Sequence, residues 1–268
     1  MSQKVNAISF RRSLKSYEWD YKYTQLNKEE YSSILYKNVE IKKYLHNLFK
    51  YYGFLLVTLK IELFKSNCII HISFLKDSQK EKLYLNSKNF ISKFINKFLI
   101  TTLSSYHNKN IGITVKLKDL NKEFEDNIVK FKHNRLEYKK IFKQLKSLKN
   151  YPSSPYLIKL VLIIITNKKS AKLLSEIISH LISTQKKRHS NILMFFKKSL
   201  TISLNSRLSA ISGIKILISG RINGFPRAKK RLLKLGSLPL QSIKSYVDYY
   251  ESTSYTLNGT FGIKVWIC

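Results

Sequence analysis

The chain has 268 residues and carries 49 Lys or Arg against 16 Asp or Glu, which gives a formal net charge of +33 and an isoelectric point near 10.0. Hydrophobic residues make up 44% of it, enough to build a packed core, so the charge belongs to a folded protein and not to a disordered tail. A charge of this size repels itself unless a polyanion neutralises it, and we therefore expect nucleic acid as the partner.

The first part of the chain predicts a small α+β unit. Residues 2–23 mix cations with aromatic residues without a steady period and are predicted to form an irregular arm. Apolar residues fall at helical spacing from Tyr31 to Lys50, which indicates an amphipathic helix. Phe54–Phe64 and Cys68–Leu75 are β-branched and aromatic runs joined by a short polar turn, the pattern of a hairpin. Residues 90–99 place one apolar stripe along a second helix.

Residues 104–155 differ in kind, because they are rich in Lys and Asn with interspersed aromatic residues and leucines. They contain a candidate strand at Ile111–Leu117 and a charged helix at Lys122–Leu148. Pro152 and Pro155 then mark a boundary. We interpret this segment as an insertion or linker whose helix lies on the surface. A helix that only faces solvent and a helix that contacts RNA explain the pattern equally well.

The last part of the chain alternates strands and helices. Its longest apolar run surrounds Leu157–Ile165 and is far shorter than the roughly 20 residues that a bilayer demands, so we predict a buried strand there. Helices are predicted at Ser170–Ser183 and Ile192–Leu208, with a basic stretch between them. Six of the eight glycines lie between Gly213 and Gly262, which indicates strands joined by tight turns.

Cations gather in this glycine-rich part. Gly220 and Gly224 bracket a short turn from which Arg221 and Asn223 are predicted to reach a phosphate, and an ordinary hairpin turn would explain the same spacing. Beyond the turn, cations alternate with leucines, so one side of the segment is predicted to face a core and the other to contact phosphates. These cations are Arg227, Lys229, Lys230, Arg231 and Lys234.

Three aromatic residues near the end, Tyr249, Phe261 and Trp266, lie in strand-like apolar surroundings. We predict that they are core residues and not base-stacking residues.

The stretch from Gly213 to Ile267 resembles the C-terminal domain of the small-subunit ribosomal protein three family. The residues that carry the resemblance are Gly213-Ile214-Lys215, Ser219-Gly220-Arg221, Gly224, Ala228, Gly236, Pro239-Leu240, Asp248-Tyr249, Gly259, Gly262 and Lys264-Val265-Trp266-Ile267. At the other end, Ser2–Asn6 with Phe10-Arg11 is similar to the family's first residues, and Val39–Leu48 looks like its first helix.

The resemblance implies an α+β protein of two domains, and the composition adds the segment between them as an insertion or linker. Residues 1–103 would form the arm and a KH-like domain, residues 104–155 the insertion, and residues 156–268 an α/β domain of two helices on a mixed sheet. In the family, the KH domain grips the nucleic-acid backbone with a glycine-bracketed loop. The corresponding residues, Leu75–Lys80, contain no glycine. We therefore expect a KH-like scaffold without the backbone clamp.

The resemblance also implies which residues contact RNA. At the N-terminus it adds Gln3, Lys4, Asn6 and Arg11 to the rRNA-binding cations and Asn223 named above. In the family, the second helix of the C-terminal domain presents basic residues to incoming mRNA. Met194-Phe195 match that helix, but Phe196 and Lys197 stand where the family has an arginine pair, and Leu200 where it has a third basic residue. The candidate mRNA-contacting residues are Lys186, Lys187, Arg188, Lys197 and Lys198.

The implied function is that of a structural constituent of the small ribosomal subunit, in its head near the place where mRNA enters. Its expected partners are ribosomal RNA, mRNA and, by family resemblance, the neighbouring proteins ten and fourteen; neither catalysis nor a cofactor is implied. The abundance of Lys, Asn, Ile and Tyr is typical of AT-rich genes, and no presequence precedes the family-like residues. We therefore expect a mitochondrial ribosome and synthesis inside the organelle, while a plastid or bacterial source stays open.

Two other classes of function fit parts of the pattern. A nucleic-acid enzyme would need carboxylates grouped around a divalent metal, whereas the nearest groupings, Glu29-Glu30 and Glu123 with Glu125 and Asp126, lie in charged helical contexts. A basic peripheral membrane protein would need amphipathic helices flanked by cations, which residues 90–103 could supply. Neither explains the C-terminal resemblance. Two cysteines and six histidines show no spacing typical of a metal site, so we expect no metal, and no membrane insertion.

Overall fold

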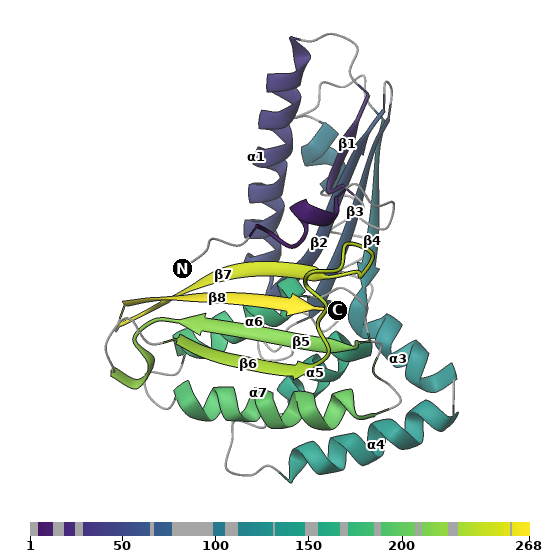
Figure 1. The fold of residues 1–268 in the computed structure, drawn as a ribbon. Helices are drawn as coiled ribbons and strands as arrows, with labels where there is room; N and C mark the ends of the chain where they lie inside the picture. Colours follow the sequence, from purple (N-terminus) through teal and green to yellow (C-terminus); the bar gives the residue numbers. More distant parts are fainter. Residues whose placement is uncertain are drawn as a thin grey trace. The chain divides into compact units, whose positions relative to one another are not determined.

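The computed structural model describes most of the chain, and its described residues form two compact units (Figure 1). The N-terminal unit is Glu18–Glu123, and the C-terminal unit combines Met1–Tyr17 with Phe124–Cys268. Both contain helices and strands, which confirms the predicted α+β class. The described residues are 5–12, 19–24, 29–64, 67–76, 99–104, 112–130, 132–147, 155–166, 171–184, 189–206, 209, 211–224, 230–257 and 259–268.

The N-terminal unit is a four-stranded sheet with the strand order β1-β2-β3-β4. Its elements are β1 (Tyr21–Tyr23), α1 (Glu30–Tyr51), β2 (Phe54–Leu63), β3 (Asn67–Lys76) and β4 (Gly112–Asp119). β2 and β3 are antiparallel, whereas β1 pairs with β2 and β4 with β3 in parallel. The predicted amphipathic helix, the hairpin and the strand near residue 112 are therefore confirmed.

One face of this sheet is apolar, and α1 packs on it. Ile41, Leu45 and Phe49 repeat every four residues along α1 and are buried. They belong to one core with the strand residues Ile61 and Ile70. The aromatic rings of α1, β2 and β3 meet edge to face or tilted, with centroids 5.4–6.1 Å apart, in the trio Phe49, Phe54 and Phe74. The sheet thus has one face in the core.

Residues 99–104 are helical and add Leu99 and Leu103 to the same core. They are the described end of the helix predicted around residues 90–99, whose earlier part lies outside the described residues. Most of the predicted loop Leu75–Lys80, which replaces the glycine-bracketed clamp, also lies outside them.

The C-terminal unit is built on a second four-stranded sheet, with the order β6-β5-β8-β7. Its strands are β5 (Gly213–Ser219), β6 (Lys230–Gly236), β7 (Asp248–Thr256) and β8 (Gly259–Ile267). All of these pairs are antiparallel. We expected a mixed sheet in this domain, but the mixed sheet is that of the N-terminal unit.

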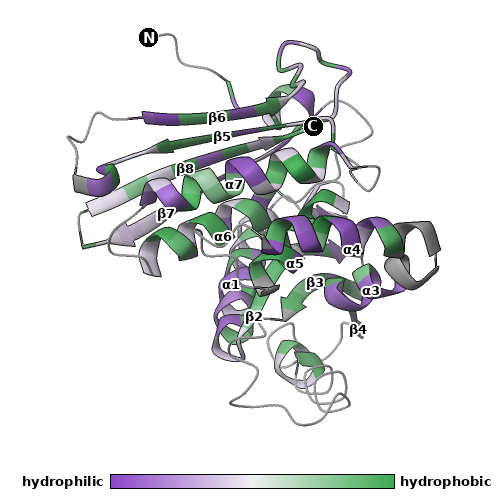
Figure 2. Ribbon diagram, turned by 90° about the horizontal axis from the view of Figure 1, so that it is seen from below, coloured by the Kyte–Doolittle hydropathy of each residue, from purple (hydrophilic) through white to green (hydrophobic). Residues whose placement is uncertain are grey.

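Helices cover one face of the C-terminal sheet. α6 (Ala171–Thr184) contacts β7 and β8, and α7 (His189–Leu204) contacts β6, as Figure 2 shows from the helix side. α4 (Lys132–Lys146) and α5 (Pro155–Thr166) pack against these helices, and a short 3-10 turn, η1 (Ser9–Arg11), comes from the N-terminal arm. The two predicted helices of this domain are confirmed.

Hydrogen bonds from β7 fix α6 on the sheet. The Asp248 carboxylate accepts a hydrogen bond of 2.8 Å from the backbone N–H of Ala171, at the first turn of α6, where a negative charge is favourable. Further along β7, the hydroxyls of Ser252 and Ser254 donate to the backbone carbonyls of Ser175 and Ser179. These bonds satisfy polar groups that the packing of helix on sheet removes from water.

Two predictions for the middle of the chain were wrong in detail. Leu157–Ile165, predicted as a buried strand, lies in α5. A continuous apolar run does not distinguish a strand from a helix that is buried all round, and α5 is buried along most of its length except at Lys159, which pairs with Glu125 at 2.8 Å. The single charged helix predicted at Lys122–Leu148 is instead two, α3 (Leu120–Lys130) and α4.

The separate domain predicted at residues 104–155 remains a prediction. Its strand β4 belongs to the N-terminal sheet, and its helix α4 contacts α5 and α7 of the C-terminal unit.

The packing of α1 yields a test of the N-terminal core. Leu45 is fully buried, so Leu45→Ala should lower the free energy of unfolding by about 2–5 kcal/mol through lost burial and a residual cavity. Leu35, on the exposed side of the same helix, is the matched control, and Leu35→Ala should change it by less than about 0.5 kcal/mol. Unfolding in urea, monitored by circular dichroism, measures the free energies of both variants. Equal losses would mean that α1 does not bury this stripe.

Candidate nucleic-acid-binding surface

Strand pleating divides the C-terminal sheet into a helix-facing side and a side that we call the outer face. Ile214, Ile216 and Ile218 of β5 are buried toward the helices. The residues between them, Lys215, Leu217 and Ser219, therefore lie on the outer face. Pairing across the sheet extends this face to Lys230, Leu232 and Lys234 of β6, Thr260, Lys264 and Trp266 of β8, and Tyr249, Glu251, Thr253 and Tyr255 of β7.

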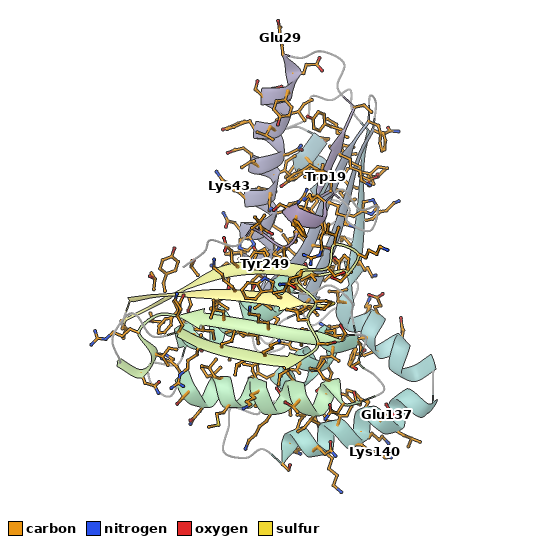
Figure 3. The ribbon with its side chains drawn as sticks, viewed as in Figure 1. Trp19, Glu29, Lys43, Glu137, Lys140 and Tyr249 are labelled. Atoms are coloured by element: carbon orange, nitrogen blue, oxygen red, sulfur yellow. The ribbon has the colours of Figure 1, made fainter. Side chains whose placement is uncertain are left out.

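One row across the outer face combines cations and aromatic rings. The register aligns Lys234, Lys215, Trp266 and Tyr249 on the four strands in order. The Lys215 ammonium lies over the Trp266 ring, 4.8 Å from its centroid, a cation–π contact. The Tyr249 and Trp266 rings lie 5.1 Å apart with a tilt of 38°. Lys215 and Lys234 thus lie in one row with the two neighbouring rings of Trp266 and Tyr249. Tyr249 is labelled in Figure 3.

This row corrects the prediction that all three aromatic residues belong to the core. Phe261 is buried and packs its ring 5.2 Å from that of His189. Trp266 is an odd number of residues further along the same strand, so it points to the opposite face, and Tyr249 is its partner on β7. Both are half-buried. Alternation along β8, counted from Phe261, is the signal that would have separated them.

The one carboxylate among the described residues of the outer face, that of Glu251, is engaged by a hydrogen bond and an ion pair. The Tyr249 hydroxyl donates to Glu251 at 2.9 Å, and Lys264 approaches the same carboxylate at 3.4 Å. Burial and this hydrogen bond raise the pKa of Tyr249, while accepting the bond lowers the pKa of Glu251. Among the described residues of this face, four lysines therefore accompany a single acidic side chain that is already engaged.

The turn after β5 has a structural role that the sequence did not reveal. Gly220 has φ of +150°, and a Cβ there would lie 2.6 Å from the Phe261 ring, so this position requires glycine. Asn223, predicted to reach a phosphate, instead accepts a hydrogen bond from the His189 backbone N–H at 2.9 Å and donates one to the Ser190 hydroxyl at 3.1 Å. It caps α7. Arg221, in the same turn, is exposed.

Burial along α7 separates the positions that can contact mRNA from those that cannot. Phe196 and Leu200, which stand at positions basic in the resembled family, are buried, and Lys197 and Lys198 are exposed. A cation at either buried position would have to be taken out of water. The exposed side of α7 therefore keeps its charge on two neighbouring lysines. Lys186, Lys187 and Arg188 lie outside the described residues.

Arg11, predicted to bind rRNA, is buried and serves the fold. Its guanidinium donates to the backbone carbonyls of Ala7 at 3.0 Å, Leu240 at 2.7 Å and Ser242 at 2.9 Å, and it reaches Pro239 at 3.3 Å. The N-terminal arm is thereby tied to the loop before β7. Carbonyl oxygens replace the anions that a buried arginine otherwise needs.

The remaining predicted rRNA contacts divide into three groups. The first group lies on the edge strand β6 and is exposed. In it Lys230 and Lys234 lie on the outer face, whereas Arg231, which pairs with Ile218, lies on the side that faces the helices. Asn6 is exposed, and its side chain accepts a hydrogen bond from the Ile8 backbone at 2.9 Å. The third group, Gln3, Lys4, Arg227 and Lys229, lies outside the described residues. Sequence reasoning missed Lys215 and Lys264.

No helix in the described part of the chain is both long and apolar enough to cross a membrane. Within the same residues, no three His, Cys, Asp or Glu side chains gather as a metal site would require.

Comparison with known proteins gives a consistent result. Residues 194–267, from α7 to the end of β8, match the model of the ribosomal protein S3 C-terminal domain. Over its whole length the chain is 25% identical to small ribosomal subunit protein uS3c of Euglena longa, of which it covers 99%. Forty per cent of the chain is 32% identical to small ribosomal subunit protein uS3 of Thermotoga maritima and covers 50% of that protein. Over 27% of its length the chain is 41% identical to uS3c of Cyanidium caldarium, of which it covers 35%.

The chain therefore spans nearly all of one relative and about half or less of the others. The matched residues build most of α7, the sheet and its outer face, and over them the chain is similar to the C-terminal domain of ribosomal protein S3.

Proposed function

We propose that the protein is a structural, RNA-binding constituent of the small subunit of an organelle ribosome. The observation that carries this proposal is the ribosomal protein S3 C-terminal domain at residues 194–267, whose sheet presents lysines on its outer face. Relatives named small ribosomal subunit proteins support it, and so does the net charge of +33. The role is architectural and needs neither catalysis nor a cofactor.

The outer face and the β5–β6 turn are the proposed rRNA contact. Lys215, Lys230 and Lys234 would neutralise phosphates, with Arg221 at the turn and Arg231 on the edge strand adding to them. Gln3, Lys4, Asn6, Arg227 and Lys229 complete the set. Lysines on long flexible stems suit phosphate contacts, which position a protein on RNA without reading its sequence.

The exposed side of α7 is the proposed mRNA contact, in the subunit head near the place where mRNA enters. Lys197 and Lys198, with Lys186–Arg188, would guide the strand by charge. Because Phe196 and Leu200 are buried, α7 presents fewer cations than the family's pattern, and we infer guidance of mRNA without strong unwinding. Small-subunit proteins ten and fourteen are the proposed protein neighbours.

The proposed compartment is the mitochondrion. Two of the reported relatives carry the plastid-type organellar name uS3c, which supports an organelle ribosome without favouring the mitochondrion, and the Lys- and Asn-rich composition suits an organelle gene. Peptide mass spectrometry of purified mitochondria and plastids separates the two organelles directly.

Sedimentation tests the ribosomal assignment. In an organelle lysate run through a sucrose gradient at high salt, the chain should stay with the small-subunit peak. High salt removes basic proteins that are bound loosely by charge, whereas a protein integrated into the subunit stays bound. Peptide mass spectrometry of the fractions locates it. Recovery of the chain at the top of the gradient or with membranes would contradict the proposal.

The outer face is tested by removing its lysines. Lys215→Gln, Lys230→Gln and Lys234→Gln together should weaken binding of the full chain to small-subunit rRNA and reduce the salt slope of log affinity by about 2–3, since each lost phosphate contact removes roughly 0.7–0.9. Three exposed lysines of α4, Lys139, Lys140 and Lys143, are the control, with Lys140 labelled in Figure 3. An equal loss in both variants would show that total charge, and not this face, determines the affinity.

The α7 lysines are tested separately. Lys197→Glu with Lys198→Glu should leave incorporation into the subunit intact, because both side chains are exposed, and should lower the affinity of the purified subunit for unstructured mRNA several-fold by repulsion. Filter binding of labelled mRNA measures this. Unchanged mRNA affinity in subunits that contain the variant would exclude α7 from the mRNA path.

A further inference from the structure

The outer face of the C-terminal sheet carries two aromatic rings that the proposed phosphate contacts leave without a role. Trp266 on β8 and Tyr249 on β7 are cross-strand partners, and their ring centroids lie 5.1 Å apart with a tilt of 38°. We call them the ring pair. Both are half-buried, and both lie on the face opposite to the buried Val265 and Ile267. They are therefore available to a partner of the outer face and not to the core.

The Tyr249 ring is held in position on its strand. Its hydroxyl donates to Glu251, two residues further along the same face of β7, at 2.9 Å. The Glu251 carboxylate lies 3.4 Å from the ammonium of Lys264, its partner on β8. A ring tied in this way has given up part of its rotational freedom before a ligand arrives. Stacking on it therefore costs less conformational entropy than stacking on a loose side chain.

Lys215 is the movable neighbour of the ring pair. Its ammonium lies over the Trp266 ring, 4.8 Å from the centroid, so this face of the indole is covered by a flexible side chain and not by packed backbone. A cation–π contact on a partly exposed ring is weak, and a base that stacks on such a ring gains more. A base that arrives with its own phosphate also gives the ammonium a new anion. An unpaired nucleotide can therefore take the place of the lysine over Trp266.

The surroundings of the ring pair combine charge with apolar area. Lys234 lies in the same row, two strands from Trp266, which is about 10 Å at the usual strand spacing. The next row contains Leu217 and Leu232, and Leu232 is 56% exposed. Apolar side chains beside the rings suit the flat body of a base, which a bare phosphate contact would not use.

This combination favours RNA over a protein as the occupant. The centres of protein–protein interfaces are depleted in lysine, whereas Lys215, Lys234 and Lys264 all lie within one row of the ring pair. Single-stranded nucleic acid is bound by cations that contact phosphates and by rings that stack on bases. A four-stranded sheet with aromatic residues on one face is one of the forms in which RNA-binding domains achieve this.

We propose that the ring pair stacks an unpaired base of RNA, with Trp266 as the platform, Tyr249 as its fixed second ring and Lys215 on the phosphate of that nucleotide. The inference rests on the proposed RNA-binding function and adds a contact that depends on the base to a surface otherwise bound by charge. The target is a single-stranded part of the RNA, because a paired base inside a helix is already stacked between its neighbours.

Two RNA strands of about 10 nucleotides separate stacking from charge. One is unstructured, and the other is abasic, with the same phosphates but no bases. Trp266→Val keeps a residue that suits a strand and should weaken binding of the full chain to the unstructured strand by about 5–150-fold, with no change for the abasic strand. The salt slope should stay the same, since no cation is removed. Trp266→Phe should retain the preference for the strand with bases.

The second tryptophan provides a matched control. Trp19, labelled in Figure 3, is 53% exposed, and Trp19→Val should leave the affinity for both strands unchanged. An equal loss in the Trp19 and Trp266 variants overturns the proposal, because the ring pair would then have no special part in binding.

Fluorescence tests the intact ring, so its outcome does not depend on how well Trp266→Val folds. The chain has two tryptophans, and Trp19→Phe leaves Trp266 as the single emitter. Stacking of a base should quench this emission when the unstructured strand is added, and the abasic strand should not quench it. Equal changes with both strands, or none with either, overturn the ring pair as a base site.

The same probes distinguish failure of this inference from failure of the proposed function. Glutamine at Lys215, Lys230 and Lys234 should weaken binding of both strands, since both carry phosphates. If that variant weakens both strands while the native chain binds them equally, the ring pair is overturned and the proposed function stands. If the native chain binds neither strand, both are overturned.

Discussion

The pleat of a β-strand sends alternate side chains to opposite faces, and both sheets of this protein are covered by described helices on one face. This constraint decides which residues form the core and which meet the surroundings. On β2 it turns Ile61 toward the core that Leu45 of α1 shares and Lys60 to the other face, and on β5 it buries Ile216 while Lys215 lies on the outer face. A chain with a net charge of +33 can fold because its described lysines and arginines other than Arg11 stay out of the buried core.

Polar groups inside the C-terminal unit are engaged by side chains distant in sequence. Asp248 caps α6 across 77 residues, and Asn223 caps α7 across 34. The left-handed backbone of Asn223, with φ of 52°, is one that asparagine tolerates better than most residues. Residues that look like ligand-binding candidates in a glycine-rich turn are thus used to hold helices in register with the sheet. The cations beside them remain for the partner.

Local patterns predicted the local structure well. Helical spacing of Ile41, Leu45 and Phe49 and the β-branched runs of the hairpin were enough to place α1, β2 and β3, because one-sided burial leaves a period in the sequence. The α5 run leaves no period, since it is buried on most sides, and so its helix was missed. The alternation of side chains along β8 would have placed Trp266 on the outer face. Long-range contacts such as those of Arg11, in contrast, leave no local signal in the sequence. The candidate surface was predicted in part through Lys230 and Lys234, and its other half, Lys215 and Lys264, follows only once the register is known.

The guanidinium of Arg11 has a consequence for the order in which the molecule is made. It bonds to the carbonyl of Ser242, 231 residues further along the chain. At the usual synthesis rate of roughly 5–20 residues per second, the arm leaves the translating ribosome some 10–50 s before its docking loop exists. During that interval the arginine remains solvated and the arm unanchored. The N-terminal segment can settle only after Ser242 has been synthesised, so closing this contact reports that the loop before β7 has been made.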